Sequence, residues 1–245
     1  MAACRENGAT AKELTQKLGA TSSEVSLALL DLFRAGRVKQ NFDEGYDPAL
    51  PYETMKWKAA EGAGAPVIGR DQEARSFLLA LSLPARAEHD FRAILESVGA
   101  LELMSAYTQY VKSAKQEILM LSPFIDRFAL YPLVEALKVN QRLRARILTE
   151  PKTLGEVMSF ISPYHDRVEA KALGATLKAE DTTKPLGLHM KSVIIDSRAA
   201  IVGSFNLVER HLHINFDCAM IFEGEAEVGQ FIRIFEGLWC LADRV

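Results

Sequence analysis

Residues 188–222 have the sequence LHMKSVIIDSRAAIVGSFNLVERHLHINFDCAMIF, and this stretch decides the fold. Two apolar runs rich in β-branched residues, 192–195 and 199–202, predict a pair of strands. Only a short polar segment separates the two runs, so we expect an antiparallel hairpin with its turn centred on Ser197 and Arg198. The register of such a hairpin determines which residues lie opposite each other.

Two pairs of polar residues lie at the open end of this hairpin. With the expected turn, Lys191 lies opposite Ser204 and His189 lies opposite Asn206. Directly opposed residues have Cβ atoms roughly 4.5–5.5 Å apart, and side chains two apart on a strand face the same way. Lys and Asn can donate hydrogen bonds to phosphate oxygens, and His can attack phosphorus or carry a proton. The sequence therefore predicts an anion site, best suited to a phosphate.

Seven residues in this region have the fixed spacing of a catalytic signature. They are His189, Lys191, Asp196, Gly203, Ser204, Asn206 and Asp217. The pattern H-x-K-x4-D-x6-G-S-x-N, followed by an acid on the next strand, resembles the HKD signature of the phospholipase D superfamily. That superfamily includes phospholipases, phosphatidyl transferases and metal-independent nucleases. The resemblance covers roughly residues 101–245.

The resemblance implies a role for each of these side chains. His189 would be the nucleophile that forms a phosphohistidine intermediate. Lys191 and Asn206 would hold the non-bridging oxygens, with help from Ser204. Asp217 would hydrogen-bond the other ring nitrogen of His189 and fix its tautomer.

Two members of the set also have structural explanations. Asp196 lies at the turn, on the strand face opposite His189, where it suits either a direct role or a hydrogen bond to nearby backbone. Ser204 could be present because a small residue allows substrate to approach closely. Both are kept among the expected catalytic residues.

The chain has one copy of the signature. Its other histidines, at positions 89, 165, 211 and 213, are not followed two residues later by Lys. Phosphoryl transfer of this kind needs a second imidazole to protonate the leaving oxygen. A two-fold dimer is the usual way to place a residue opposite its own copy, so we expect a homodimer with a shared active site.

Helical and strand patterns alternate from residue 101 onward. The predicted helices are 101–115, 130–139, 153–161 (with Thr153 as a cap) and 225–241, and the predicted strands are 117–121, 143–148, 168–172 and 216–222. The alternation predicts the fold class α/β, and the resemblance implies a phospholipase-D-like mixed β-sheet flanked by helices. We expect residues 61–75 to be a linker and residues 71–98 to be mostly helical. The predicted domains are an N-terminal domain over 1–60 and a catalytic domain over 101–245, joined by residues 61–100.

The first 60 residues resemble a small winged helix-turn-helix domain. Thr10 and Glu13 form a capping-box pattern before a short helix that Gly19 ends, and a second helix spans 24–35. Residues 37–40 and 52–59 suggest the wing. The expected nucleic-acid contacts are Ser22, Ser23, Ser26, Lys39, Lys56, Lys58 and Lys184. Residues 1–62 carry eight basic and nine acidic side chains, which leaves protein binding or dimerisation as an alternative to DNA contact.

Composition limits the remaining possibilities. The 245 residues carry a net charge of −3, so nucleic-acid binding requires a local basic patch. No signal peptide or membrane span is visible and three cysteines show no C-x-x-C spacing, which predicts a cytoplasmic protein. His211 and His213 could suggest a metal pair, but no cysteine or carboxylate trio accompanies them, and we expect no metal and no cofactor.

The function predicted from these patterns is a metal-independent phosphodiesterase that cleaves DNA or RNA. The whole layout also resembles the phospholipase-D-like component of bacterial DISARM-type anti-phage defence systems, which implies protein partners in a defence complex. One alternative is a phospholipase or phosphatidyl transferase. Another is a catalytically silent DNA-binding or scaffolding protein.

Overall fold

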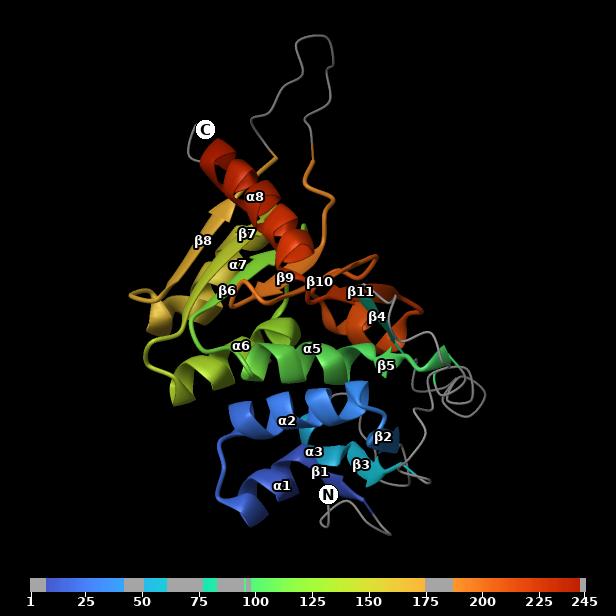
Figure 1. Cartoon of the computed structure of the whole chain (residues 1–245). Helices are drawn as coiled ribbons and strands as arrows, with labels where there is room; N and C mark the ends of the chain where they lie inside the picture. The colour runs from blue at the N-terminus through green and yellow to red at the C-terminus, as the bar shows by residue number, and fades with distance from the viewer. Residues whose placement is uncertain are drawn as a thin grey trace.

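A computed structural model describes residues 8–41, 51–60, 77–82, 95, 98–174 and 187–242 (Figure 1). The predicted linker, 61–75, and Lys184 lie outside the described residues.

Eight strands form one mixed sheet in the order β5-β4-β11-β10-β9-β6-β7-β8. They are β4 (Phe77–Leu81), β5 (Leu101–Glu102), β6 (Glu117–Leu121), β7 (Arg144–Thr149), β8 (Val168–Ala172), β9 (Ser192–Ile195), β10 (Ala199–Gly203) and β11 (Cys218–Phe222). The central strands β6, β9, β10 and β11 pair antiparallel, whereas β7 and β8 continue the sheet in parallel from β6. The predicted strands of the α/β region are therefore confirmed.

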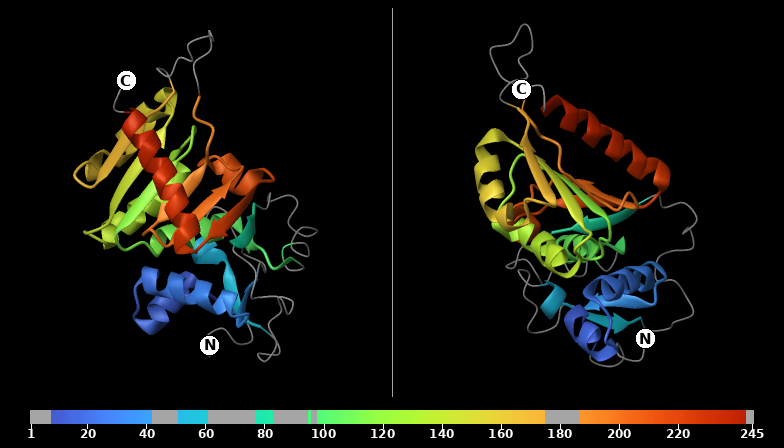
Figure 2. Two further views of the ribbon diagram at one scale, coloured as in Figure 1. Left: turned by 45° about the horizontal axis from the view of Figure 1, so that its top comes forward. Right: turned by 90° about the vertical axis from the view of Figure 1, so that its left-hand side faces the viewer.

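Helices cover both faces of this sheet (Figure 2). The helices α5 (Leu103–Lys112), α6 (Arg127–Val139) and α7 (Pro151–Ile161) lie on one face, and α8 (Glu225–Ala242) crosses the other. Alternation along β6 explains the two layers, because Ile118 and Met120 pack in the first core and Leu119 and Leu121 pack under α8. A mixed sheet between helical layers confirms the predicted fold class of this region.

The helical prediction for residues 71–98 is wrong over 77–81, although Leu95 and Val98 are helical. Phe77–Leu81 form strand β4, which pairs antiparallel with β11 and parallel with β5. The sequence FLLAL is a short, wholly apolar run, and periodicity alone cannot distinguish a buried strand from a helix in such a run. The catalytic sheet therefore begins before residue 101.

The predicted cap of α7 also needs correction. Glu150 is the N-cap residue of α7, and Pro151 occupies the first helical position. Thr153 lies inside the helix, where its hydroxyl donates to the Pro123 carbonyl oxygen at 3.0 Å.

The β9–β10 hairpin has a different register from the expected one. Ala199 pairs with Ile195, so the turn contains three residues, 196–198, instead of two. Asp196 and Ser197 have φ of 51° and 55°, a left-handed conformation that short polar side chains tolerate better than most.

This shift moves the partners of the polar pairs by one residue. The Gly203 N–H donates to the Lys191 carbonyl oxygen at 3.4 Å, so Lys191 lies across from Gly203 and not from Ser204. His189 and Asn206 lie beyond the paired segments, and their predicted opposition is wrong for the same reason.

The N-terminal residues form a separate small sheet with two main helices. The elements are β1 (Ala9–Thr10), α1 (Ala11–Leu18), α2 (Ser22–Arg34), β2 (Val38–Asn41), α3 (Pro51–Thr54) and β3 (Lys56–Ala59), with strand order β1-β3-β2. Thr10 with Glu13 and Thr21 with Glu24 form capping boxes, and Gly19 ends α1 in the left-handed conformation. The predicted helices are confirmed. Part of the expected second wing strand, 52–59, is instead the short helix α3.

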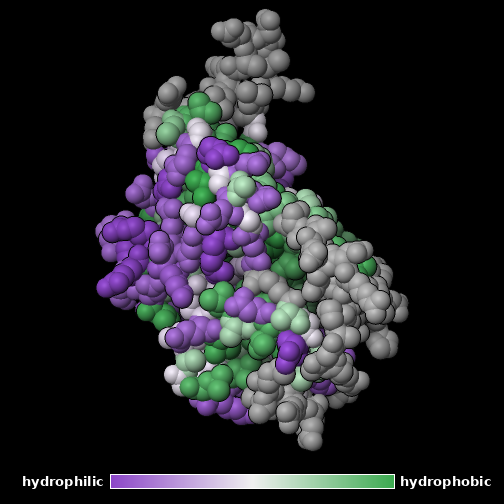
Figure 3. All heavy atoms as spheres, in the orientation of Figure 1, coloured by the Kyte–Doolittle hydropathy of each residue, from purple (hydrophilic) through white to green (hydrophobic). Residues whose placement is uncertain are grey.

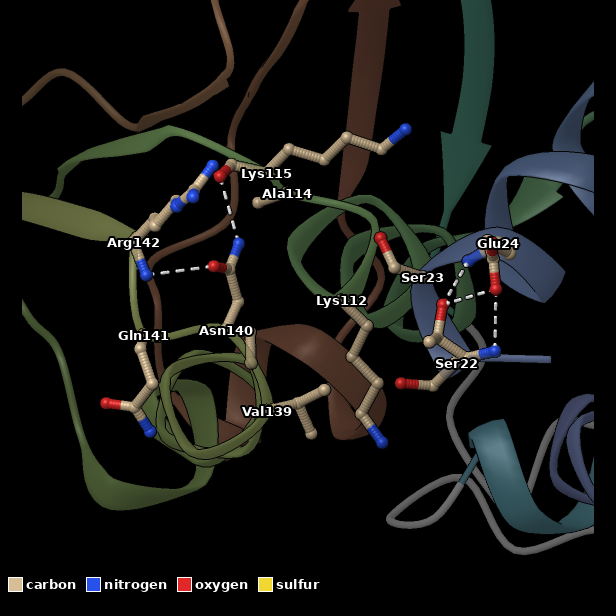
Figure 4. A pocket seen from close by; sticks show the side chains of 12 residues that line it. Ser22, Ser23, Glu24, Lys112, Ala114, Lys115, Val139, Asn140, Gln141 and Arg142 are labelled. Carbon is tan, nitrogen blue, oxygen red and sulfur yellow. Dashed lines mark hydrogen bonds between the residues drawn. The ribbon is translucent and has the colours of Figure 1, made fainter.

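This N-terminal unit packs on the outer side of α5, through α2 and α3 (Figures 1 and 2). Ser26 on α2 is completely buried. A cavity of about 430 Å³ opens beside this contact, between the start of α2 and the ends of α5 and α6 (Figure 4). Lys112, Lys115 and Arg142 are among the residues that line it.

Among the described helices, none is both long enough and apolar enough to cross a membrane. Hydrophilic side chains cover much of the face of the molecule drawn in Figure 3.

Candidate active site

His189 and Lys191 meet immediately before β9. The Lys191 Nζ lies 3.1 Å from the His189 Nδ1 and donates to the His189 carbonyl oxygen at 2.6 Å. Lys191 is only 6% exposed, and this burial lowers its pKa, while the negative charges of Asp217 and Glu150 act in the opposite direction. His189 itself is exposed. The pair thus presents a solvent-exposed imidazole next to a buried lysine amine.

Gly203 allows the next part of the site to form. An added Cβ would lie 2.1 Å from the Cys218 carbonyl oxygen and 2.8 Å from the Ala219 Cα, so the backbones of β10 and β11 can approach closely only without a side chain here. Ser204 then follows, with its N–H donating to the same Cys218 carbonyl oxygen at 3.1 Å. The glycine of the signature is therefore explained by packing between strands.

Ser204 and Asp217 are linked across this strand pair. The Ser204 hydroxyl donates to the Asp217 Oδ1 at 2.5 Å and accepts from the Cys218 N–H at 3.3 Å. Ser82, just after β4, also holds this segment, because its hydroxyl accepts from the Asp217 N–H at 2.6 Å. Asp217 is thereby fixed through both its backbone and its side chain.

The expected hydrogen bond between Asp217 and His189 is absent from the described contacts. The Asp217 Oδ2 instead lies 2.9 Å from the His211 Nδ1. The π-helical turn η4 (Arg210–Ile214) carries His211 into this position, a geometry that spacing alone does not reveal. The sequence pattern suggests His211 only as part of a metal pair with His213. A histidine six residues before the expected acid was the signal available for this contact.

Asn206 lies in the segment of chain between β10 and the π-helical turn η4. Its Nδ2 is 3.4 Å from the His211 Nε2, whereas its Oδ1 is buried and has no hydrogen-bond partner. Ser122, at the end of β6, fixes the adjacent backbone by accepting from the Leu207 N–H at 3.2 Å.

Asp196 lies at the other end of β9 from His189. Its carboxylate accepts three backbone hydrogen bonds, from Lys115 and Gln116 at 2.7 Å and from Glu117 at 3.0 Å. The structure therefore does not bring Asp196 to the polar patch. Asp196 thus binds backbone N–H groups, but they belong to the start of β6 and the residues before it and not to its own turn.

The tentative nucleic-acid residues fall into two groups. Ser26 is buried, and Ser23 places its hydroxyl oxygen out of reach of solvent, so α2 as docked cannot present Ser26 to a DNA groove. That part of the prediction is wrong because α5 occupies this side of α2. Lys39 and Lys58, in contrast, are opposite each other on β2 and β3, and Lys39 is exposed.

In the part of the chain that the structure describes, no group of three or more His, Cys, Asp or Glu side chains is arranged to hold a metal ion. The chemistry available at the site is that of His189, Lys191, Ser204, Asn206, His211 and Asp217.

A family model described as "Cardiolipin synthase, PLD-like domain" matches residues 107–239, more than half of the chain and the whole of this site. The chain belongs to this phospholipase D-like family. Membership supports a phosphodiesterase activity of the phospholipase D type.

Other known proteins are similar to this phospholipase D-like chain in sequence or in structure. The chaperone protein ClpB of Corynebacterium diphtheriae is 28% identical over 242 residues, which cover 93% of this chain and 27% of that protein. The chain thus spans about a quarter of the length of the curated relatives it matches. NucT from Helicobacter pylori has a TM-score of 0.49 and 14% identity, covering 66% of this chain and 96% of that one. The phosphatidylserine synthase of Haemophilus influenzae Rd KW20 has a TM-score of 0.49 and 11% identity, covering 67% and 38% respectively.

Proposed function

We propose that this phospholipase D-like protein is a metal-independent phosphodiesterase that cleaves nucleic acid through a phosphohistidine at His189. The observation that carries the proposal is the exposed His189 imidazole held 3.1 Å from the buried Lys191 ammonium. Among the described residues no carboxylate forms an ion pair with Lys191, and a buried cation in that state suits an incoming phosphate. Asn206 and Ser204 add amide and hydroxyl groups next to it.

The proposed reaction has two steps. His189 attacks phosphorus, the bond from phosphorus to the leaving oxygen breaks, and that oxygen takes the proton carried by His189 of the partner subunit. Water then attacks the phosphohistidine and gives its proton back to the partner's His189. The P–N bond breaks, which releases a phosphate monoester and restores His189.

Lys191 has to move for the first step. When its ammonium donates to the His189 Nδ1, a neutral ring carries its proton on Nε2 and cannot attack through that atom. A phosphate oxygen is a better acceptor for the ammonium than the ring nitrogen is, so substrate would draw Lys191 away. The ring can then lose its Nε2 proton to solvent and take one up on Nδ1, and the deprotonated Nε2 becomes the nucleophile. The contact seen in the chain is thus a resting arrangement.

The homodimer remains part of this proposal. His165 directly follows η3 (Ser162–Tyr164), and its Nδ1 contacts the Ser162 carbonyl oxygen. His211 is engaged with Asp217 through its Nδ1. The second imidazole is therefore proposed to be His189 of the partner subunit, placed by a two-fold axis.

The N-terminal unit is proposed to be a winged helix-turn-helix domain over residues 1–60, with its basic wing towards nucleic acid. The strand order β1-β3-β2 and the helix pair α1 and α2 support the fold. Lys39 and Lys58 support the placement of the wing, since they are cross-strand neighbours. A place in an anti-phage defence complex is proposed only from the resemblance of the layout. Protection of bacteria against phage by wild-type protein, lost with His189→Ala, would test that role.

The first test is cleavage of single-stranded and double-stranded DNA and of RNA in excess EDTA, by wild type and by His189→Ala. We expect wild type to cleave at least one of these and the variant to lose at least about 10³-fold in rate, since the nucleophile is gone. His165→Ala, which changes an exposed histidine, is the matched control and should keep the wild-type rate.

Other outcomes would contradict the proposal in distinct ways. Cleavage that EDTA abolishes would indicate metal chemistry, and cleavage that survives in His189→Ala would indicate another nucleophile. Hydrolysis of phospholipid vesicles without cleavage of nucleic acid would favour a lipid enzyme.

A further inference from the structure

The contacts around Asp217 assign a positioning role to a residue outside the HKD signature. We propose that His211 links Asp217 to Asn206 and thereby fixes the direction in which the Asn206 amide donates to a bound phosphate. The inference deepens the proposed function and rests on it, because it concerns the same phosphate site.

The first step is the tautomer of His211. The Nδ1 of His211 lies 2.9 Å from the Asp217 Oδ2, and a carboxylate can only accept, so Nδ1 carries the proton. In the neutral ring the Nε2 is then an acceptor. Asp217 is held in turn by the Ser204 hydroxyl and by Ser82, so the carboxylate cannot easily turn away.

The second step is the orientation of the Asn206 amide. The Nε2 acceptor of His211 lies 3.4 Å from the Asn206 Nδ2, which can donate to it. The opposite orientation would place the Oδ1 acceptor against the Nε2 acceptor, with no proton between them. His211 therefore selects one of the two amide orientations, which would otherwise be similar in energy because the terminal torsion of Asn is broad and roughly two-fold.

The third step connects this orientation to phosphate binding. The Asn206 Nδ2 has two hydrogens, and His211 uses one, which leaves the other for a phosphate oxygen. The Oδ1 is buried without a partner, a cost that a purely structural asparagine would not retain. Together these contacts form a chain from Asp217 through His211 to Asn206. Asn206 is the residue that touches substrate, and His211 acts through it.

The position of His211 makes the proposal testable by substitution. Its side chain is 27% exposed, so a change there leaves the main cores intact. His211→Leu removes both hydrogen bonds. His211→Gln restores them, because a glutamine amide has a donor and an acceptor separated like the two imidazole nitrogens.

The experiment measures kcat/KM for bis(4-nitrophenyl) phosphate, a small diester that does not need the N-terminal unit. We expect His211→Leu to lower kcat/KM about tenfold, the usual effect of one lost hydrogen bond to a charged group, and His211→Gln to recover most of it. In an Asn206→Ala background, His211→Leu should cause little further loss, because the two residues act as one unit. His165→Leu changes an exposed histidine and is the matched control. It should leave kcat/KM unchanged.

A spectroscopic measurement on the same proteins separates this inference from the proposed function. Long-range ¹H–¹⁵N spectra of histidine-labelled wild type should show the proton of neutral His211 on Nδ1, and Asp217→Asn should change that signature. If wild type cleaves no diester, the proposed function fails, and the tautomer still decides whether His211 is oriented as we infer. A proton on Nε2 would overturn the inference. The inference would also be overturned if wild type were active and His211→Leu had the same kcat/KM. Losses in kcat/KM from His211→Leu and Asn206→Ala that add in the double variant would overturn it too.

Discussion

At the scale of single residues, the role of Gly203 gives a direct prediction. We expect Gly203→Ala to destabilise the protein by about 1–3 kcal/mol, because its Cβ would overlap the Cys218 carbonyl oxygen and neither strand can yield easily. The forced separation of β10 and β11 also moves Ser204 away from Asp217, so diesterase activity should fall with stability. Urea unfolding and the rate on bis(4-nitrophenyl) phosphate measure the two effects.

Gly155→Ala provides the matched control. Gly155 lies inside α7, and an added Cβ would meet nothing within 4 Å. Alanine there should raise stability by about 0.4–1 kcal/mol and leave activity unchanged. If both variants behaved alike, the close approach of β10 and β11 would not be what requires glycine at residue 203.

The sequence predicted which residues would gather near the site better than it predicted their partners. The fixed spacing predicted that His189 lies beside Lys191, because side chains two apart on a strand share a face, but not that Ser204 contacts Asp217. It did not predict that Asp217 would contact His211, since that contact depends on a π-helical turn and on side-chain rotamers. The partners of the Asp196 carboxylate were also not predicted, because they are backbone N–H groups of a segment about 80 residues away.

At the scale of elements, periodic helices and strands were predictable and register was not. Strands β6, β7 and β9 to β11 each have enough β-branched or apolar residues between breaks to be recognised. The hairpin turn differed by one residue because the Asp196 carboxylate, bound to the start of β6, stabilises a left-handed turn that no local signal encodes. Strand β4 was missed because its partner β11 lies far away in sequence.

The attachment of α8 gives a prediction at this scale. Arg146 on β7 donates to Glu236 at 2.9 and 2.5 Å and to Glu117 at 3.1 Å, with its guanidinium 5.5 Å from the centre of the Phe235 ring. The hydrogen bonds from Arg146 lower the pKa of Glu236 despite partial burial. A folded pKa below the unfolded value, about 4.3, means that the contribution is present above that pH and is lost as the pH falls through the folded pKa.

We therefore expect Glu236→Gln to be less stable than wild type at pH 7 and nearly equal to it at pH 3. The difference at pH 7 should be about 0.5 kcal/mol, because the Glu236 side chain is 42% exposed and solvent screens the pair. Thermal unfolding at several pH values measures it. Glu156→Gln, which breaks a more exposed pair with Arg127, is the control and should show no such trend. A gap that widened towards pH 3 would contradict the sign argued here.

At the scale of the whole molecule, the sequence separated an N-terminal unit from an α/β region but did not predict how they meet. Capping boxes and glycine stops define α1 and α2 locally. Their contact with α5 depends on buried surfaces of both parts. Glu24 and Asp31 on α2 are exposed, and two carboxylates do not favour the entry of this helix into a DNA groove.

A buried polar contact between the two parts gives the last prediction. Gln40 on β2 is 5% exposed, and its Oε1 accepts from the Glu102 N–H at 3.0 Å, while the buried Glu102 carboxylate caps α5 through Met104 and Ser105. Gln40→Ala would remove the acceptor that Gln40 offers to this buried N–H, at a cost of about 1–3 kcal/mol. We expect faster hydrogen exchange at the start of α5 and a lower urea midpoint, with the diesterase rate retained, because the His189 contacts lie elsewhere. Lys39→Ala, one residue earlier on the same strand and exposed, should change neither. Equal behaviour of the two variants would mean that the N-terminal unit does not rest on α5 through this contact in solution, and that α2 is free to meet another partner.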